Sequence, residues 1–330
     1  MPDKPLTRRL ITVPTVIALF IAVTALSPLL ALGGATVDLT RWLATRKPWV
    51  SLRVLAFLWV YLLGEVWALA MLAVTAPLGR VGGLGVTYRL QALWAAWNLR
   101  ALQMLFSVEL DVEGTDSLLP GPVIILSRHA SMVDTLLPAR LVATPGGLRL
   151  RYVLKSELLA DPALDIAGNR LPNAFINRLS REGDGLASIR DLATTMGPAE
   201  GILIYPEGTR FSAAKLRSHQ RRVGDDEGAV GAAISSFRRV LPPRPGGTLA
   251  LLEASDADVV VLAHRGLEGL ATVAEIWKGG LVGSTIEIAL WRIPRSDVPP
   301  TRPDRVDWLH RVWMDIDRWV VSREPGPEVV

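Results

Sequence analysis

The segment Val123-Ile-Ile-Leu-Ser-Arg-His129-Ala-Ser-Met-Val-Asp134 joins a short apolar run directly to small and polar residues. Its four apolar residues, three of them β-branched, predict a buried strand over residues 123–126. A strand that leads into a turn and then into a helix is typical of a parallel α/β sheet. Such a turn exposes its side chains at the carboxyl edge of the sheet, where ligands bind.

His129 and Asp134 are the side chains of this turn with acid–base chemistry. On a regular helix their spacing leaves them about 140° apart, so they could not pair there. They can pair if His129 lies in the turn and Asp134 lies in the first helical turn. Asp134 would then orient the imidazole as a general base. A surface histidine beside a helix-starting acid is the ordinary alternative.

Similar short runs recur along the chain and are separated by helical patterns, for example at 187–195 and 229–240. Strands that alternate with helices predict an α/β fold with a mainly parallel sheet flanked by helices. We assign this domain to residues 86–300. The proline- and glycine-rich stretch 242–247 predicts a break in the pattern. The further strands are expected at 175–176, 202–205, 259–262 and 285–290.

A second motif, Tyr205-Pro-Glu207-Gly208-Thr209-Arg210, follows the strand expected at 202–205. Gly208 permits a tight turn, so Glu207 and Arg210 can project into the same carboxyl-edge crevice. An arginine there suits a phosphate, through its charge and its two-pronged hydrogen bond. A carboxylate–arginine pair that closes an ordinary loop is the alternative. Two other apolar runs are followed by candidate second and third cations, Arg178 and Lys155.

Four segments, in this order and spacing, resemble the motifs of the glycerophospholipid acyltransferases, over roughly residues 95–295. Residues 129–134 resemble the His-x4-Asp motif of that family, and residues 207–210 its Glu-Gly-Thr-Arg motif. Residues 175–178 are similar to its phosphate-binding motif, and residues 154–158 to its Lys-x-Glu-Leu segment. The stretches 237–244 and 258–261 are closer to the longer branch of lysophosphatidate and lysocardiolipin acyltransferases.

The sequence departs from the family pattern at two places. The last motif of the family has a proline within a short apolar run, whereas residues 259–263 contain none. The resemblance implies that this run helps to shape the acyl or acceptor pocket, so it defines the choice of substrate less well than it defines the catalytic residues. A glycine expected before the phosphate-binding arginine is replaced by Asn173-Ala174.

The resemblance implies transfer of an acyl chain from acyl-CoA, or from acyl carrier protein, to the sn-2 hydroxyl of lysophosphatidic acid, giving phosphatidic acid. His129 would take the proton of the hydroxyl, and Asp134 would orient His129. The phosphate of the acceptor would be held by Arg210, Arg178 and Lys155. The supporting residues of the site would be Glu207, Gly208, Thr209, Arg128 and Ser131.

No metal ion or other cofactor is expected, because the acyl thioester is a co-substrate and the lipid hydroxyl is itself the nucleophile. The chain contains no cysteine, which excludes disulfides, zinc–cysteine sites, iron–sulfur clusters and a thiol nucleophile. Of the four histidines, His219, His264 and His310 show no ligand spacing. We interpret His264 as structural.

The N-terminal part, residues 1–85, predicts a membrane-anchoring hairpin with segments at about 10–32 and 54–77. The first segment carries no charge and is longer than the apolar region of a signal peptide. The second is interrupted by Glu65, which we expect to face protein, water or the membrane interface. A re-entrant hairpin on one membrane face fits equally well, and a buried hairpin of a soluble domain is the remaining alternative.

Charge is unevenly distributed along the chain. The first 110 residues hold ten Lys/Arg and four Asp/Glu, a net +6, and the remaining residues carry a net −2. Positive charge beside apolar segments suits an anionic lipid surface, and it is not the pattern of a nucleic-acid-binding domain. The basic residues that flank the two segments favour an integral or tightly associated membrane protein with its active site on the cytoplasmic face.

The C-terminal part, residues 301–330, predicts an amphipathic helix over 307–321 and a tail. Trp308, Leu309, Val312, Trp313, Ile316 and Val320 recur at helical spacing, which fits either core packing or membrane contact.

The basic stretch 215–228 reads as a loop-like insertion. Its cations could contact CoA phosphates or anionic headgroups, but the acids at 225–227 follow at once, so a solvated loop is the simpler interpretation.

Two rival functions remain at this level. One is acylation of another lysophospholipid, such as lysophosphatidylinositol or lysocardiolipin, because all of these present a phosphate near a glycerol hydroxyl. The other is a non-catalytic lipid-binding membrane protein. Loss of His129, Asp134 or Arg210 would have favoured the second rival, and all three residues are present.

Overall fold

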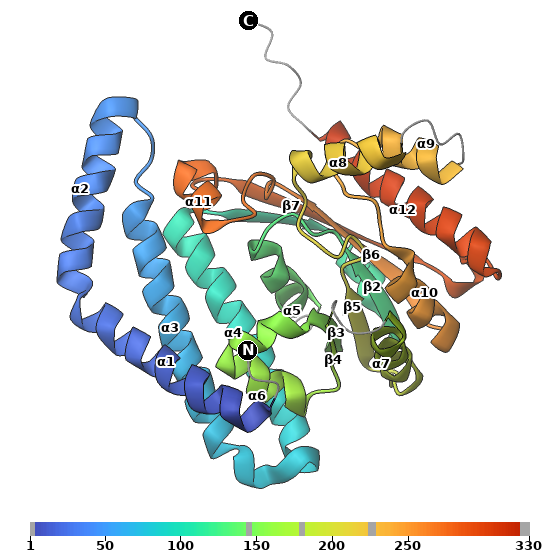
Figure 1. Ribbon diagram of the computed structural model, residues 1–330, viewed down its shortest axis with the longest axis horizontal. Helices are drawn as coiled ribbons and strands as arrows, with labels where there is room; N and C mark the ends of the chain where they lie inside the picture. Colours follow the sequence, from blue (N-terminus) through green and yellow to red (C-terminus); the bar gives the residue numbers. More distant parts are fainter. Residues whose placement is uncertain (1–3, 143–146, 178–181, 224–228, 324–330) are drawn as a thin grey trace, which may run out of the picture. The chain divides into compact units, whose positions relative to one another are not determined.

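The computed structural model describes residues 4–142, 147–177, 182–223 and 229–323 (Figure 1). The chain divides into two compact units, each built from three separate chain segments. Unit 1 comprises residues 1–109, 135–181 and 273–284, and unit 2 comprises residues 110–134, 182–272 and 285–330. The division that sequence order suggests, at residues 85 and 300, remains a prediction.

Unit 1 is mainly helical. Two strands, β3 (Arg149–Lys155) and β4 (Ala174–Ile176), pair in parallel, with Lys155 opposite Ile176. The helix α3 is central, since it packs against α1, α2, α4 and α6. The helices of this unit are α1 (Pro5–Ala25), α2 (Ser27–Thr45), α3 (Ser51–Val74), α4 (Gly79–Phe106), α5 (Leu137–Leu141), α6 (Pro162–Arg170) and the short α11 (Val273–Glu275).

The first predicted apolar segment, 10–32, is two helices rather than one. The helix α1 ends at Ala25 and α2 begins at Ser27, with Leu26 as the joint. Pro28 lies in the first turn of α2, and its missing N–H cannot continue the hydrogen-bond ladder of α1. The second segment, 54–77, corresponds to α3. By length and composition alone, α1 and α3 could each cross a membrane.

The helices α1, α2 and α3 correspond to the predicted hairpin, and both its base and its tip are bonded to other parts of unit 1. At one end, the guanidinium of Arg8 forms two hydrogen bonds with the buried carboxylate of Asp165 in α6, at 2.7 and 3.0 Å. Although burial opposes it, the charges of Arg8 and Arg9 hold the pKa of Asp165 below its ordinary value. At the other end, Arg41 of α2 donates to the carbonyl of Trp277, and the indole N–H of Trp277 donates to Ser51.

Unit 2 is a mixed sheet flanked by helices. Its strand order is β1-β7-β6-β2-β5, with β2 parallel to β5 and β6, and with β7 antiparallel to β6. All five residues of β2 are buried, which explains its unbroken apolar run. The predicted fold class is confirmed. The strands are β1 (Glu109–Glu113), β2 (Val123–Ser127), β5 (Glu200–Ile204), β6 (Asp258–Arg265) and β7 (Thr285–Ile293).

Two local predictions are corrected by the helices of unit 2. The insertion expected as a loop contains a helix, α8, because its lysine, arginine, glutamine and alanine residues favour helix and Leu216 is buried. The predicted break at 242–247 is shorter than expected, because residues 242–244 lie outside the helices and α10 begins at Pro245, which is in its first turn. The helices are α7 (Glu182–Thr194), α8 (Ala213–Val223), α9 (Ala229–Ser236), α10 (Pro245–Ala254) and α12 (Arg302–Ser322).

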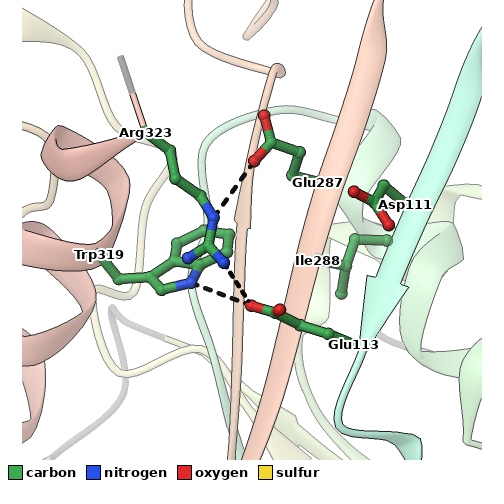
Figure 2. Close-up of a pocket in the computed structure, with 6 residues that line it drawn as sticks. All are labelled: Asp111, Glu113, Glu287, Ile288, Trp319 and Arg323. Atoms are coloured by element: carbon green, nitrogen blue, oxygen red, sulfur yellow. Dashed lines mark hydrogen bonds and ion pairs between the residues drawn. The ribbon is translucent and has the colours of Figure 1, made fainter.

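The helix α12 packs against β6, α9 and α10, and its apolar stripe is core (Figure 1). All six residues of the stripe are buried, among them Trp313 and Ile316, which are fully inaccessible. Beyond its end, Arg323 forms ion pairs with Glu113 and Glu287, and Trp319 donates to Glu113 (Figure 2). These contacts line a small polar pocket of about 20 Å³ and hold α12 against β1 and β7.

Candidate active site

The turn after β2 brings His129 and Asp134 together. Asp134 lies in a short 3₁₀ helix, Val133–Leu136, and its Oδ1 is 2.9 Å from Nδ1 of His129. The other carboxylate oxygen, Oδ2, accepts the backbone N–H groups of Ala130 and Ser131, at 2.6 and 2.7 Å. The turn thus wraps around the carboxylate and fixes it. Because Nδ1 of His129 faces a carboxylate, it carries the proton, which leaves Nε2 as the basic nitrogen.

Asp134 is completely buried and remains ionised. Burial alone would raise its pKa, but the hydrogen bonds from His129 and His264 outweigh burial and hold the pKa well below its ordinary value. Within unit 2, the imidazole of His129 also packs on the ring of Tyr205, at 4.6 Å between ring centroids. The carboxylate can therefore stabilise a protonated His129 during a reaction.

His264, which the sequence analysis interpreted as structural, lies behind Asp134. It is fully buried on β6, its Nε2 donates to the carbonyl of Arg128 at 3.1 Å, and the same nitrogen is 3.5 Å from Oδ2 of Asp134. The parallel pairing of β2 with β6, which places Ser127 beside Leu262, is what brings His264 to this point. Sequence spacing alone does not show that pairing.

Glu207 braces the turn from β5. It is buried, its Oε1 accepts the backbone N–H of His129 at 3.1 Å, and its Oε2 accepts that of Leu241 at 3.0 Å. Burial raises the pKa of Glu207 to about 7, although Arg128 and both N–H donors act in the opposite direction. The carboxylate thus holds the backbone of His129.

The loop that carries Glu207 is also tied to His129 directly. Gly208 has a φ of +66°, a conformation that favours glycine, and its N–H closes a turn onto the carbonyl of Tyr205. Phe211 N then donates to the carbonyl of His129 at 2.7 Å. The two motifs, far apart in the sequence, form one site in unit 2.

Arg128 and Ser131 are structural supports of this site. Arg128 is fully buried, and its guanidinium donates to the carbonyls of His264 and Arg239 and pairs with Glu268. Ser131 is also buried, and its hydroxyl donates to the carbonyl of Leu270 at 2.6 Å. Neither side chain is exposed to a substrate in this arrangement.

The predicted phosphate ligands are distributed between the two units. In unit 2, Arg210 is half-buried, and its Nη1 donates to the carbonyl of Ala271 at 2.5 Å. The hydroxyl of the neighbouring Thr209 accepts from Nζ of Lys215 at 3.0 Å. Lys155 ends β3 in unit 1, and Arg178 lies outside the described residues.

A family comparison agrees with this geometry. Residues 109–262, from the start of β1 to within β6, match the model of the Acyltransferase family. This stretch is an acyltransferase-family domain. It contains both motifs of the site, so the acyltransferase domain includes His129, Asp134, Glu207 and Arg210, and the family predicted from the sequence motifs is confirmed.

Comparison with solved structures gives a match over part of this chain. The 1-acyl-sn-glycerophosphate (LPA) acyltransferase PlsC from Thermotoga maritima is 12% identical in sequence, with a TM-score of 0.45. The match covers 80% of this chain and 99% of that one. No curated protein sequence matches this chain.

Proposed function

We propose that this protein is a membrane-associated acyltransferase that transfers an acyl chain from a thioester to the sn-2 hydroxyl of lysophosphatidic acid. The observation that carries the proposal is the His129–Asp134 pair, held in a buried turn of an acyltransferase-family domain. The side chain of His129 is 13% exposed, and none of the described residues bonds to its Nε2. That nitrogen is available to a substrate hydroxyl.

The reaction follows from these positions. Nε2 of His129 takes the proton of the acceptor hydroxyl as its oxygen attacks the thioester carbonyl carbon. The carbon–sulfur bond breaks, and the leaving thiolate takes the proton back from the imidazolium. Asp134 stabilises the transient positive charge on His129, and Glu207 holds the backbone of His129 in place. The reaction needs no metal ion and no further cofactor, since both reactants are substrates.

The acceptor headgroup is assigned from the phosphate ligands. In this proposal Arg210 binds the phosphate of lysophosphatidic acid, with Lys155 and Arg178 as further cations. A half-buried arginine whose guanidinium is partly oriented by the carbonyl of Ala271 suits two-pronged phosphate binding. Fixing the phosphate keeps the neighbouring hydroxyl within reach of His129, which replaces a bimolecular encounter by an oriented one.

The first experiment measures thiol release from acyl-CoA by purified protein in detergent, with and without lysophosphatidic acid. We expect release that depends on the acceptor, and a loss of at least about 100-fold in His129→Ala, since general-base catalysis supplies that much. Ser296→Ala, an exposed position in unit 2, is the control.

Other outcomes of this experiment would change the assignment. Release with another lysophospholipid alone would replace lysophosphatidic acid as the acceptor. If no thiol is released from acyl-CoA or from acylated carrier protein, the alternative of a non-catalytic lipid-binding protein would be favoured.

We also propose that the outer apolar face of α1 and α2 binds the membrane. Large apolar side chains are exposed along both helices; for example, Leu10 is 67% and Leu29 is 69% exposed. So large an apolar surface is unusual for a protein in water. The others on this face are Leu6, Ile11, Ile17, Leu19, Ile21, Leu26, Leu32, Val37, Leu39, Trp42 and Leu43.

The contacts of the hairpin favour association with a single leaflet. A hairpin that crossed the roughly 30 Å hydrocarbon core would place its base and its tip on opposite sides of the membrane. Here the base contacts Asp165 through Arg8 and the tip contacts Trp277 through Arg41, and both partners belong to unit 1. In the described part of the chain, only α1 and α3 are long and apolar enough to cross. The excess of basic residues in the first 110 supports the cytoplasmic face.

A further inference from the structure

Asp317 is an acidic residue on the buried face of α12. Its residue is only 6% exposed, and Trp313, Ile316 and Val320 beside it are core residues of unit 2. Residues four apart on a helix lie one above the other, so Asp317 points to the same side as the fully buried Trp313. A buried carboxylate without hydrogen-bond donors is costly, so a specific set of donors is expected around it.

The donors are three consecutive backbone N–H groups of unit 2. Oδ1 accepts the N–H groups of Arg238, Arg239 and Val240, at 3.1, 2.6 and 3.0 Å. Oδ2 accepts the N–H of Arg238 as well, at 3.1 Å. These residues lie between α9 and α10 and belong to no helix or strand, so their N–H groups have no ladder of regular hydrogen bonds. One carboxylate thus fixes the backbone of this stretch.

The same stretch is bonded to the turn that carries His129. The carbonyl of Arg239 accepts from Nη2 of Arg128, the residue before His129, at 2.6 Å. Leu241 N donates to Oε2 of Glu207, whose Oε1 accepts the backbone N–H of His129. The contacts therefore lead from the carboxylate of α12, through residues 239 and 241, to both side chains that support the turn.

Packing secures the ends of this stretch but not its middle. Phe237 at one end and Val240 and Leu241 at the other are buried. Between them, Arg238 is exposed and lines a cavity of about 390 Å³. Protein interiors are otherwise close-packed, so the backbone beside this cavity has space in which to move. Its hydrogen bonds, rather than packing, fix its position.

We propose that Asp317 is a positioning residue for the acyl transfer and holds His129 in place through the stretch 238–241. The inference rests on the proposed function, because His129 is the base of that reaction. Without the carboxylate, the stretch would shift relative to Arg128 and Glu207, and the turn would lose part of its support. A small displacement of a catalytic group slows the reaction strongly. The groups that bind the substrates are not part of this set of contacts.

The test compares Asp317→Ala with Asp317→Asn in the thiol-release assay. Asp317→Ala leaves the three N–H groups without their acceptor and should lower kcat about tenfold, with the KM values for both substrates within about twofold. Asparagine can keep an oxygen where Oδ1 is, so Asp317→Asn should retain most of kcat. The matched control is Asp315→Ala, which removes an exposed carboxylate from the same helix and should leave kcat and both KM values unchanged.

Hydrogen exchange of the backbone separates this inference from the proposed function. In Asp317→Ala, peptides that contain the amides of residues 129 and 238–241 should exchange about tenfold faster than in the wild type, because the hydrogen bonds that protect them are weakened. The same peptides of Asp317→Asn and Asp315→Ala should exchange like those of the wild type. This result supports the inference even if no lysophospholipid is acylated.

Three outcomes would overturn the inference. One is faster exchange at 238–241 alone, with exchange at His129 and kcat unchanged, since Asp317 would then only stabilise the fold. Another is unchanged exchange at both places. The third is a loss of kcat in Asp317→Asn as large as in Asp317→Ala. If Asp317→Ala does not fold, Asp317→Ser takes its place, because a shorter hydroxyl cannot accept all three N–H groups.

Discussion

At the scale of single residues, the candidate site includes His264 as well as the two motif residues. Its Nε2–H points at the carbonyl of Arg128 and at Oδ2 of Asp134, so it supports the carboxylate from the side opposite His129. We expect His264→Leu to lower kcat about tenfold, which is the effect of losing one hydrogen bond to a buried charge, with both KM values within about twofold. Thiol-release kinetics measure this.

A conservative variant and a pH profile test whether His264 acts through Asp134. His264→Gln keeps an N–H donor near the position of Nε2 and should restore most of kcat. In His264→Leu, the pKa of Asp134 should rise towards its ordinary value, because one of the hydrogen bonds that lower it is gone. The acid limb of the pH–rate profile should then move to higher pH. Unchanged profiles in both variants would assign His264 to packing alone.

At this scale, the sequence predicts contacts between residues that are close in the chain and misses contacts between residues that are far apart. The proximity of His129 to Asp134, and the tight turn at Gly208, follow from neighbouring residues and from strand-end chemistry. The role of Glu207 does not, since its partners are the backbone groups of His129 and Leu241, 78 and 34 residues away. Such contacts depend on strand order and register, which periodicity does not specify.

At the scale of elements, apolar pattern alone does not distinguish core from membrane. The stripe of α12 is buried against unit 2, whereas the apolar residues along α1 and α2 are exposed. The two patterns look alike in the sequence because both repeat at helical spacing. The pattern also does not predict the joint at Leu26 or the helix α8. Each depends on hydrogen bonds or apolar contacts with other parts of the fold, which the local sequence does not specify.

The exposed face of α1 and α2 predicts vesicle binding. Replacing Leu10, Ile21, Leu29 and Leu32 by serine should weaken binding to anionic vesicles by at least about a hundredfold, since four large side chains leave the membrane. The fold should persist, because these side chains are 60–69% exposed. Flotation with vesicles measures the loss. Leu119→Ser/Val273→Ser, also exposed and apolar, is the control and should float like wild type.

At the scale of the whole molecule, the side of the membrane on which the base and the tip of the hairpin lie shows whether the hairpin crosses it. Because the chain contains no cysteine, single cysteines can be placed at Lys4, Lys47 and Ser296, all of which are exposed. If the hairpin lies on one leaflet, a membrane-impermeant thiol reagent should label all three from the same side of sealed vesicles. Labelling of Lys47→Cys from the side opposite to Ser296→Cys would show a hairpin that crosses. Detergent-treated vesicles give the total reactivity of each cysteine.

A division of the chain by sequence order yields domains that are each one continuous segment. The compact units of this chain are instead each made of separate segments. Residues 135–181 lie between segments of unit 2 and belong to unit 1, as do residues 273–284. The alternation of strands and helices is enough to predict an α/β fold. It cannot predict that helix α6 belongs with the N-terminal helices, since that depends on the pairing of Arg8 with Asp165.

That pair imposes an order of events during synthesis. Arg8 leaves the ribosome first, and its partner follows 157 residues later. At about 5–20 residues per second, the N-terminal helices wait roughly 8–30 s for the carboxylate that fastens them. During this interval their apolar face and an unpaired guanidinium are both uncovered, and an anionic lipid surface can accommodate the two together. On the proposed membrane association, the lipid surface would be a temporary partner of the nascent chain before it becomes the binding surface of the folded protein.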